Sequence, residues 1–534
     1  MQSRLRLSSR LWVVWCLILH TTAGLLHAEQ FDIYTYTVTP ENTITITQAS
    51  NPIGAITVPA TIEGKPVTTI GGSSFSGCTG LTSIILPDSL TSIGVDAFSY
   101  CPGLTSVTLP DSLASMGNRS FFGCRSLTSI VLPESLTATG DFVFFECTGL
   151  TTITFPSSLI SIGSHAFYGC GKLTNLNLPL LLTSIGDAAF LNNVELTTLT
   201  FPPSLLSIGA HAFGGCDKLT DLTLPSSLIS VGDNAFSYSD CLTSVTLPAS
   251  LTIIGNKAFA HCPLLNNITL PPSLTSIGDE TFYNCIGLTN ITLPSSLTSI
   301  GKSAFFRCSL LIAPTLPSSV ASIGTSAFSY CGSFTSLTLP SSLESIGDGV
   351  FSNCTGLISL SLPPSLTSMG NYAFSNCPRL ISLTLPPSLT SLGESTFSGC
   401  TGLKSLTFPA SLISIGNWSL YGCANLTSLT LPASLTTIGN YSFSNCSGLT
   451  SLTLPASLVS IGKYSFSNCT RLTKLFFLGN SPPGITVEVV FSRPPPTGYT
   501  TYWLSSKTGF TAPSGKAIVP SGLTKPPIPP LRGC

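Results

Sequence analysis

The sequence of 534 residues predicts a solenoid, a fold in which coils of chain of similar length stack on one another. Cysteines recur at intervals of 23 residues or multiples of 23 from Cys78 to Cys469, and 16 of the 18 positions in this series hold Cys. Asn193 and Ser239 fill the other two. Every position has a Gly seven residues before it, and all but one have a Phe three residues before it, the exception being Leu420. A fixed period of this length is the sequence signature of a repeat architecture.

Each unit has the residue pattern of one β-strand followed by turns. One copy reads TGLTSIILPDSLTSIGVDAFSYC, and the end of its apolar run 81–86 alternates as a half-buried strand does. Pro87 ends that strand because proline cannot donate to a β-ladder. Gly94 allows a positive φ or a close approach of backbone, and Phe98 and Cys101 lie in a short helical or irregular return segment. A single unit cannot offset the entropy cost of its own ordering, so the units must stack.

The pattern L-x-x-I/L-x-L-P-x-S-L-x-x-I-G-x-x-A-F-x-x-C resembles the BspA-like (Treponema pallidum type) class of leucine-rich repeats, from about Ile56 to Leu475. The resemblance implies a leucine-rich repeat solenoid of the α/β type, dominated by β-structure. It would be a curved right-handed coil of about 18 repeats of 23 residues, with a parallel sheet on the concave face. It also implies a secreted or surface protein, because most members are of that kind and some are implicated in adhesion.

The two ends of the sequence depart from the repeat. Arg4, Arg6 and Arg10 precede a short apolar run, and Ala28 offers a small residue for cleavage, an order typical of a secretory signal peptide. Alternating Thr, Ile and Val after the leader favour a β-hairpin that caps the first coil. We predict these regions: a signal peptide at 1–28, the hairpin cap at 29–55, the solenoid at 56–477, a degenerate C-terminal cap at 478–524 and a Pro-rich tail at 525–534.

The composition narrows the classes of function. Only 8% of the residues are charged, and 21 Lys and Arg against 22 Asp and Glu leave a formal net charge of −1. A basic footprint for nucleic acid is therefore excluded. Mean hydropathy is high, at +0.45, but no apolar run after the N-terminus approaches the roughly 18 residues of a membrane-spanning helix. We expect no nucleic-acid partner and no membrane insertion after signal cleavage, and we expect the protein to be secreted or at the cell surface, in an extracellular or periplasmic location.

The regular cysteines are predicted to be buried thiols. Each follows an apolar segment at fixed spacing, and free Cys is among the most buried residue types. Disulfides between adjacent coils remain an alternative, because the strand spacing of about 5 Å is within disulfide range. Cys534 lies at the chain terminus, which makes it the candidate for an intermolecular disulfide.

Neither a cofactor nor a catalytic constellation is expected. Histidine is rare, the cysteines are not in metal-binding pairs, and no nucleophile–base arrangement stands out. Four Asp residues follow the repeat Gly on alternate coils, about 10 Å apart, which is too far to share one calcium ion. The same spacing separates His165 from His211, so a surface role is favoured over metal ligation. The four acidic residues are Asp141, Asp187, Asp233 and Asp279.

A column of threonines is the first candidate binding surface. Thr occupies the outward position between the last two apolar residues of the strand in 13 units, often with Ser or Asn two residues earlier. Three explanations remain open: simple strand propensity on a solvated face, a neutral hydroxyl-rich binding surface, and ice binding, which a concave sheet fits poorly. We take as candidates Thr223, Thr246, Thr269, Thr292, Thr338 and Thr384.

An aromatic row near the C-terminal end is the second candidate. Tyr372, Trp418, Tyr441 and Tyr464 all stand two residues after the repeat Gly, the last three on consecutive coils. Such a row suits stacking on sugar rings or a protein-binding hot spot. Alternatively, these side chains pack over their own coils.

The sequence therefore predicts a leucine-rich repeat protein, not an enzyme, that mediates protein binding or adhesion through an extended solenoid surface. Its partner would be an extracellular protein or a glycan. The alternatives are a carbohydrate-binding module that uses the aromatic row, and a purely structural surface or matrix protein.

Overall fold

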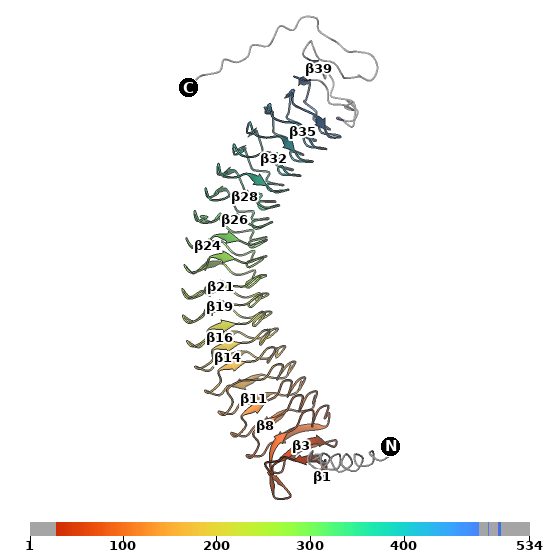
Figure 1. The fold of residues 1–534 in the computed structure, drawn as a ribbon, viewed down its shortest axis with the longest axis vertical. Coiled ribbons are helices and arrows are strands. Elements are labelled where there is room, and N and C mark those ends of the chain that lie inside the picture. Colours follow the sequence, from red (N-terminus) through yellow and green to blue (C-terminus); the bar gives the residue numbers. More distant parts are fainter. Residues whose placement is uncertain (1–27, 480–489, 491–499, 504–534) are drawn as a thin grey trace, which may run out of the picture. The chain divides into compact units, whose positions relative to one another are not determined.

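A computed structural model describes residues 28–479, Val490 and the backbone of 500–503. Almost all of the predicted signal peptide, most of the predicted C-terminal cap, the Pro-rich tail and Cys534 lie outside the described residues. The chain divides into two compact units, Met1–Cys216 and Asp217–Cys534, and each is considered by itself. Within each unit, successive coils follow one another in chain order (Figure 1).

The N-terminal end of the first unit carries strands that run antiparallel to their neighbours. Strands β1 (Glu29–Phe31), β2 (Tyr34–Val38) and β3 (Ile44–Ala49) form an antiparallel meander. Strand β3 then pairs in parallel with β6 (Lys65–Ile70), which also pairs antiparallel with β5 (Thr61–Ile62). The inward side chains of β2 and β3 are buried, so the meander covers the end of the apolar core.

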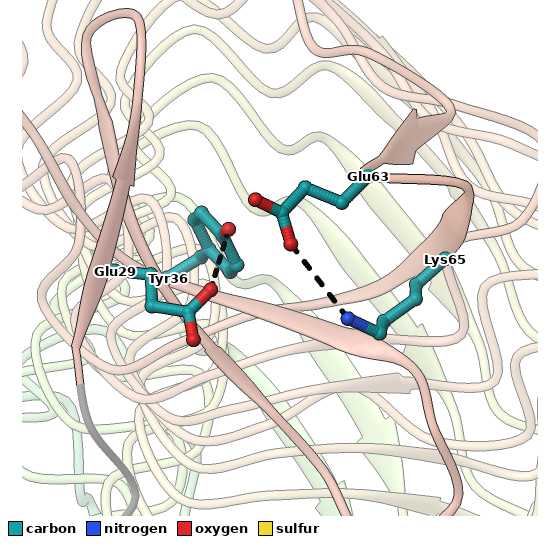
Figure 2. A network of polar contacts seen from close by, with 4 residues as sticks. All are labelled: Glu29, Tyr36, Glu63 and Lys65. Atoms are coloured by element: carbon teal, nitrogen blue, oxygen red, sulfur yellow. Dashed lines mark hydrogen bonds and ion pairs between the residues drawn. The ribbon is translucent and has the colours of Figure 1, made fainter.

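Two polar contacts hold this end together. The Tyr36 hydroxyl donates to Glu29 Oε2 at 2.7 Å, and Lys65 Nζ lies 3.7 Å from Glu63 Oε2 (Figure 2). The Tyr36 side chain is almost fully buried, so this hydrogen bond satisfies a phenol that would otherwise be costly to desolvate. The hydrogen bond from Tyr36 to the carboxylate is also the main reason that its pKa is raised above its ordinary value.

In the first unit most coils contribute one longer and one two-residue strand segment, which pair in parallel with segments of the same type, and the coil of β11 has an isolated bridge at Ala138 in place of its short segment. The longer segments are β4 (Gly54–Thr57), β7 (Leu81–Ile85), β9 (Ser106–Thr108), β11 (Ser129–Val131), β12 (Thr152–Thr154), β14 (Asn175–Asn177) and β16 (Thr198–Thr200). The two-residue segments are β8 (Ser92–Ile93), β10 (Ser115–Met116), β13 (Ser161–Ile162), β15 (Ser184–Ile185) and β17 (Ser207–Ile208).

The second unit repeats this arrangement, except that the coils of Pro314 and Thr430 lack the longer strand segment. Its longer segments are β18 (Asp221–Thr223), β20 (Ser244–Thr246), β22 (Asn267–Thr269), β24 (Asn290–Thr292), β27 (Ser336–Thr338), β29 (Ser359–Ser361), β31 (Ser382–Thr384), β33 (Ser405–Thr407), β36 (Ser451–Leu454), β38 (Lys474–Phe477) and β39 (Thr500–Trp503). Its short segments are β19 (Ser230–Val231), β21 (Ile253–Ile254), β23 (Ser276–Ile277), β25 (Ser299–Ile300), β26 (Ser322–Ile323), β28 (Ser345–Ile346), β30 (Ser368–Met369), β32 (Ser391–Leu392), β34 (Ser414–Ile415), β35 (Thr437–Ile438) and β37 (Ser460–Ile461).

The register of these pairs equals the sequence period. Ile130 pairs with Ile153, for example, and Leu383 pairs with Leu406, so each side chain meets its own copy in the next coil. The architecture is a parallel β-solenoid of about 19 turns of roughly 23 residues, which confirms the predicted fold class. The return segments, expected to be helical or irregular, consist of turns, and residues 28–479 contain no helix.

A ladder of phenylalanine rings runs through the core of each unit. Phe98 and Phe121 stack with ring centroids 5.1 Å apart and planes 7° from parallel, and Phe305 and Phe328 stack at 5.2 Å and 3°. These rings are fully buried. The inward assignment of the repeat Phe is therefore confirmed, and Leu420 occupies the same buried position where Phe is missing.

The repeat Gly is required by close approach and not by a positive φ. A Cβ on Gly94 would lie 2.6 Å from the backbone N of Gly72, a separation that real Cβ atoms essentially never show. The left-handed residues instead lie two and six positions after the repeat Gly, as Asp96 (φ 56°) and Tyr100 (φ 54°) do. Each coil therefore turns at two left-handed residues, and a glycine lets neighbouring backbones come close together.

Candidate functional site

The six candidate threonines all lie on the exposed face of the longer strands in the second unit. Thr223 pairs with Thr246, and Thr269 with Thr292, in the parallel register of β18, β20, β22 and β24. All six side chains are exposed, whereas the residues beside them in the strands, such as Leu222, are buried. The alternating burial of the strands agrees with the prediction that this column faces outward.

Polar side chains beside the threonines form hydrogen bonds with their counterparts on the neighbouring strand. The Ser244 hydroxyl donates to Asp221 Oδ1 at 2.6 Å, and Asn290 Nδ2 donates to Asn267 Oδ1 at 3.0 Å. The Ser244 hydroxyl, with two threonine hydroxyls, lowers the pKa of the Asp221 carboxyl, which is therefore ionised at neutral pH. From β18 to β33, the threonine column and the column two residues before it contain one charged side chain, that of Asp221. The surface is otherwise neutral.

Pro314 interrupts this surface. It takes the place of the central apolar strand residue, and without an N–H it cannot join the ladder. Hydrogen-bonded pairing therefore stops at β24 and resumes at β27, and the neighbouring Ile312 is exposed. Thr338 lies on the sheet beyond this break, β27–β29, and Thr384 lies on a further sheet, β31–β33. Pro314 was visible in the sequence and could have predicted the break.

The aromatic row is brought together in part. The rings of Trp418 and Tyr441 stack at 4.1 Å and 11°, and Tyr441 lies 5.1 Å from Tyr464 at 43°. These three side chains are half-buried. Tyr372 stands apart, separated by the coil of Ser395, and its hydroxyl donates to Glu394 Oε1 at 2.6 Å. All four have φ between 55° and 59°, so their backbone is in the left-handed region that non-glycine residues adopt at a cost.

The stacking limits what the aromatic row can bind. A sugar ring binds an aromatic side chain by lying on its face, yet the facing sides of Trp418 and Tyr441 are covered by each other. Tyr421 lies against Trp418 as well, at 5.2 Å and 57°. Rings stacked in this way present their edges outward, and those edges carry the phenol and indole polar groups. This geometry suits a protein partner better than a series of stacked sugars.

Further aromatic stacks occur outside the predicted row. In the second unit, Tyr238 stacks on His261 at 4.4 Å, and Tyr283 stacks on Phe306 at 4.9 Å. His261 also lies 5.3 Å from Tyr283, and Tyr330 lies 5.3 Å from Phe306, so five consecutive coils carry one continuous run of rings. We call this run the second-unit stack: Tyr238, His261, Tyr283, Phe306 and Tyr330.

A shorter stack occupies the first unit. Phe122 stacks on Phe145 at 4.7 Å, and Phe145 stacks on Tyr168 at 4.4 Å. His165 stacks on Phe142 at 4.5 Å and is half-buried, so it acts as an aromatic ring. Sequence analysis missed the second-unit stack because its members occupy two positions, five and six residues after the repeat Gly, and it missed the first-unit stack although Phe122, Phe145 and Tyr168 share the first of these positions. Reading the two positions together would have found them.

The acidic column has a structural role. Asp141 Oδ1 accepts a hydrogen bond from the Ser164 backbone N–H at 2.8 Å, and Asp279 Oδ1 accepts one from the Lys302 N–H at 2.6 Å. Each carboxylate thus caps the same position of the next coil. Within residues 28–479, no group of three or more His, Cys, Asp and Glu side chains is arranged to hold a metal ion.

The cysteine column also bonds from coil to coil. Cys101 Sγ donates to the Phe75 carbonyl at 3.0 Å, and Cys354 Sγ donates to the Phe328 carbonyl at 3.2 Å. Asn193, one of the two replacements, makes the equivalent bond from Nδ2 to a Phe carbonyl at 3.0 Å. These cysteines are buried thiols, and burial raises the pKa of Cys354 to about 12. The prediction that the regular cysteines are buried thiols is therefore correct, and these thiols act as hydrogen-bond donors.

Comparison with known families identifies the repeat. Five segments of the chain, 55–171, 137–264, 183–312, 252–381 and 367–482, match the family described as "BspA type Leucine rich repeat region (6 copies)". The matches span most of the described residues. The chain belongs to this family of BspA-type leucine-rich repeat proteins, as the resemblance in sequence suggested.

Solved structures of leucine-rich repeat proteins are similar to this chain. A leucine-rich repeat protein from Bacteroides ovatus is 23% identical, with a TM-score of 0.52, and the match covers 90% of this chain and 100% of that protein. A leucine-rich cell surface protein from Faecalibacterium prausnitzii is 25% identical (TM-score 0.38, 71% and 94% covered). The leucine-rich repeat protein of T. pallidum is 23% identical (TM-score 0.17, 53% and 91% covered). The Bacteroides protein supports the fold.

No curated protein matches the chain. Among the described residues, none of the secondary structure is a helix with the length and apolar character that crossing a membrane requires.

Proposed function

We propose that this protein is a secreted or cell-surface binding scaffold that holds an extracellular protein on the outer side of its return segments. It would act by non-covalent recognition, without a cofactor and without catalysis, and it would bind no nucleic acid. Membership of the BspA-type family supports this proposal. So does the uniform interior, because a repeat protein presents an extended preformed surface in place of one reactive pocket.

The second-unit stack is the observation that carries the proposal. It joins tyrosine, histidine and phenylalanine side chains over five coils, and Arg307 lies 6.0 Å from the centroid of the Tyr330 ring. Tyr238 and Tyr330 are each about half exposed. Tyrosine, tryptophan and arginine are the residue types enriched in protein-binding hot spots. The stacking also holds these rings in place, which lowers the entropy cost of binding.

The test compares protein and glycan ligands on the same variants. The purified full chain would be applied to immobilised extracellular matrix proteins and to a glycan array. The double variant Tyr283→Ala with Phe306→Ala is expected to bind at least tenfold more weakly to the matrix protein that the parent binds most strongly. Trp418→Ala with Tyr441→Ala tests the aromatic row in the same way.

Val459→Thr serves as the control, because it removes an exposed apolar side chain of the second unit that belongs to neither aromatic group. Its binding should equal that of the parent. Binding to glycans alone, lost in the Trp418 and Tyr441 variant, would favour the carbohydrate-binding alternative. Self-assembly without any ligand would favour a structural surface protein. Either result would overturn the proposal.

A further inference from the structure

A serine column ties together the turns that follow the longer strands. These turns read Pro-x-Ser-Leu, and the Ser hydroxyl donates to a backbone carbonyl of the preceding coil. Ser158 donates to the Leu136 carbonyl at 2.7 Å in the first unit, and Ser296 to the Leu274 carbonyl at 2.7 Å in the second. From position 89 to position 457, Ser occupies every place of this column except one. The exception is Leu181.

Leu181 breaks this rule, and its neighbour Leu180 is exposed beside it. They are the central residues of a turn closed by the Leu182 N–H, which donates to the Pro179 carbonyl at 3.1 Å. Leu180 is 72% exposed and Leu181 is 57% exposed. Replacing a hydrogen-bonding serine by a leucine that is still 57% exposed forfeits about 1 kcal/mol of hydrogen bonding for only partial burial. A position that breaks a local rule without stabilising the fold is expected to serve function.

Other exposed apolar residues flank this turn on the neighbouring coils. The Thr183 N–H donates to the Ile160 carbonyl at 2.8 Å, and the Leu206 N–H donates to the Thr183 carbonyl at 2.9 Å. Ile160 and Leu206 therefore lie on the coils directly before and after, and both side chains are exposed. Exposed apolar side chains thus occur on three successive coils.

The next turn along is equally close. The Ser204 hydroxyl donates to the Leu180 carbonyl at 2.7 Å, which places this turn against the Leu180 turn. Pro203, exposed in the same turn, adds a further apolar residue to the surface. It holds the position that Leu180 holds one coil earlier.

Acidic side chains continue this column toward the N-terminus. Asp88, Asp111 and Glu134 occupy the position of Leu180 on earlier coils, and all three are exposed. The Ser157 hydroxyl and N–H donate to Glu134 at 2.8 and 3.0 Å, and these bonds lower the pKa of the Glu134 carboxyl.

The nearest cation of this column does not neutralise the acids. Lys65 lies one coil before Asp88 and pairs with Glu63 (Figure 2). A negative segment therefore leads into an apolar one, and the column spans about 24 Å at a coil spacing of about 4.8 Å. We call it the acidic–apolar stripe: Asp88, Asp111, Glu134, Leu180, Leu181 and Pro203.

We propose that the acidic–apolar stripe binds an extended segment of a partner protein in which cationic side chains are followed by apolar ones. The cations would lie beside the carboxylates of Asp88 and Asp111, and the apolar side chains would cover Leu180 and Leu181. An extended segment of about eight residues matches the length of the stripe. This surface lies in the first unit and is distinct from the second-unit stack.

Charge complementarity selects this partner over others. Nucleic acid and anionic membranes would be repelled by the carboxylates at one end of the stripe. A purely apolar partner would leave those carboxylates without counter-charges. A basic–apolar segment satisfies both ends, and each end supplies part of the specificity.

The test uses a defined probe and a variant that restores the serine column. The probe is a fluorescein-labelled peptide of three lysines, two glycines and three leucines, and its binding to the full chain is measured by fluorescence anisotropy. Leu180→Ser combined with Leu181→Ser is expected to weaken binding at least tenfold. The same variant should melt at the same temperature as the parent or higher, because Leu181→Ser restores the hydrogen bond that the other coils make at this place.

Further variants separate charge from apolar contact. Asp88→Asn with Asp111→Asn is expected to weaken binding about tenfold at low salt and to remove most of its salt dependence. A peptide with glutamates in place of the lysines should not bind. Ile413→Thr removes a comparably exposed apolar side chain from the second unit and should leave binding unchanged.

Several outcomes would overturn the proposal. The parent protein could fail to bind the probe, or the Leu180 and Leu181 double variant could bind it as tightly as the parent does. Sedimentation that shows a dimer lost in that double variant would identify a second copy of the chain as the occupant instead. Binding to vesicles of anionic phospholipid through the same residues would identify a membrane.

Discussion

The inner and outer sides of the return segment follow different rules, and Phe305 and Phe306 show this in adjacent residues. Phe305 is fully buried and stacks on Phe282 and Phe328, its own copies in the neighbouring coils. Phe306 is half-buried outside and stacks on Tyr283, a different residue. On the inner side each residue must fit copies of itself, so one residue type recurs. On the outer side no such constraint applies, so different aromatic residues meet there, and we propose that these runs serve binding.

The largest expected change in the free energy of unfolding comes from the inner cysteines as pH rises. Burial raises the pKa of Cys354, and that of Cys469, to about 12, above the ordinary value of 9.0. The folded chain therefore keeps these thiols protonated, whereas the unfolded chain ionises them. The stabilising contribution of these two thiols is complete below pH 9 and is lost as pH rises toward 12, at about 1.4 kcal/mol per pH unit for each of the two.

Urea unfolding under reducing conditions at pH 7, 9 and 10 measures this effect. The free energy of unfolding should change little between pH 7 and 8 and fall steeply above pH 9. A free energy that stays constant up to pH 10 would show that the cysteines titrate alike in both states.

Phe351→Ala tests the inner ladder directly. Phe351 is fully buried between Phe328, at 5.9 Å, and Phe374, at 5.5 Å. Removing the ring leaves a cavity lined by both neighbours, so the free energy of unfolding should fall by about 3–5 kcal/mol. Thermal and urea unfolding measure the loss. An unchanged melting profile would contradict the inner position of this ring.

Gly301→Ala tests the close approach of neighbouring coils. A Cβ at this position would lie 2.6 Å from the backbone carbonyl carbon of Gly278. Backbone atoms cannot move aside as a side chain can, so the coils must separate locally, at about 1–3 kcal/mol. Gly422→Ala is the comparison, because a Cβ at Gly422 would lie 3.9 Å from its nearest neighbours, backbone atoms of Gly399, so a loss there comes from the positive φ and not from a clash. A Gly301→Ala variant as stable as the parent would show that close packing is not the reason for the repeat Gly.

The smallest effect concerns the left-handed backbone on the outer side. Ser326 has φ 57° and is half-buried. Ser326→Gly should raise the free energy of unfolding by about 0.5 kcal/mol, and Ser326→Val should lower it by about 1–2 kcal/mol. Urea unfolding distinguishes the two variants. Valine tolerated as well as glycine would mean that the coil does not need this torsion.

The sequence predicted the parts of the fold in which like residues meet. The period, the inward Phe and the buried Cys follow from one-dimensional spacing, because the register of the sheets equals the period. The left-handed residues left a weaker signal. Positions such as Ser326 and Tyr372 hold many residue types, and what they share is the absence of Pro and of β-branched residues.

The candidate site was less predictable, because it depends on neighbours in adjacent columns. The stacking of Trp418 on Tyr441 could be expected from their shared position, but the covering of their faces required ring orientations. The second-unit stack alternates between two columns, and a search of one column does not find it. The loss of stability caused by leucine at position 181 can be recognised only when the hydrogen bond made by the serines at this position in other coils is known.

Amide hydrogen exchange on two variants of neighbouring coils tests the difference between the two sides most directly. Phe351→Ala removes an inner ring, and Tyr372→Ala removes an outer one whose hydroxyl bonds to Glu394. Phe351→Ala should speed exchange in its own coil and in the coils of Phe328 and Phe374, whereas Tyr372→Ala should leave exchange there as in the parent. Equal acceleration by both variants would show that the outer aromatics hold the stack together and are not free to serve as a binding surface.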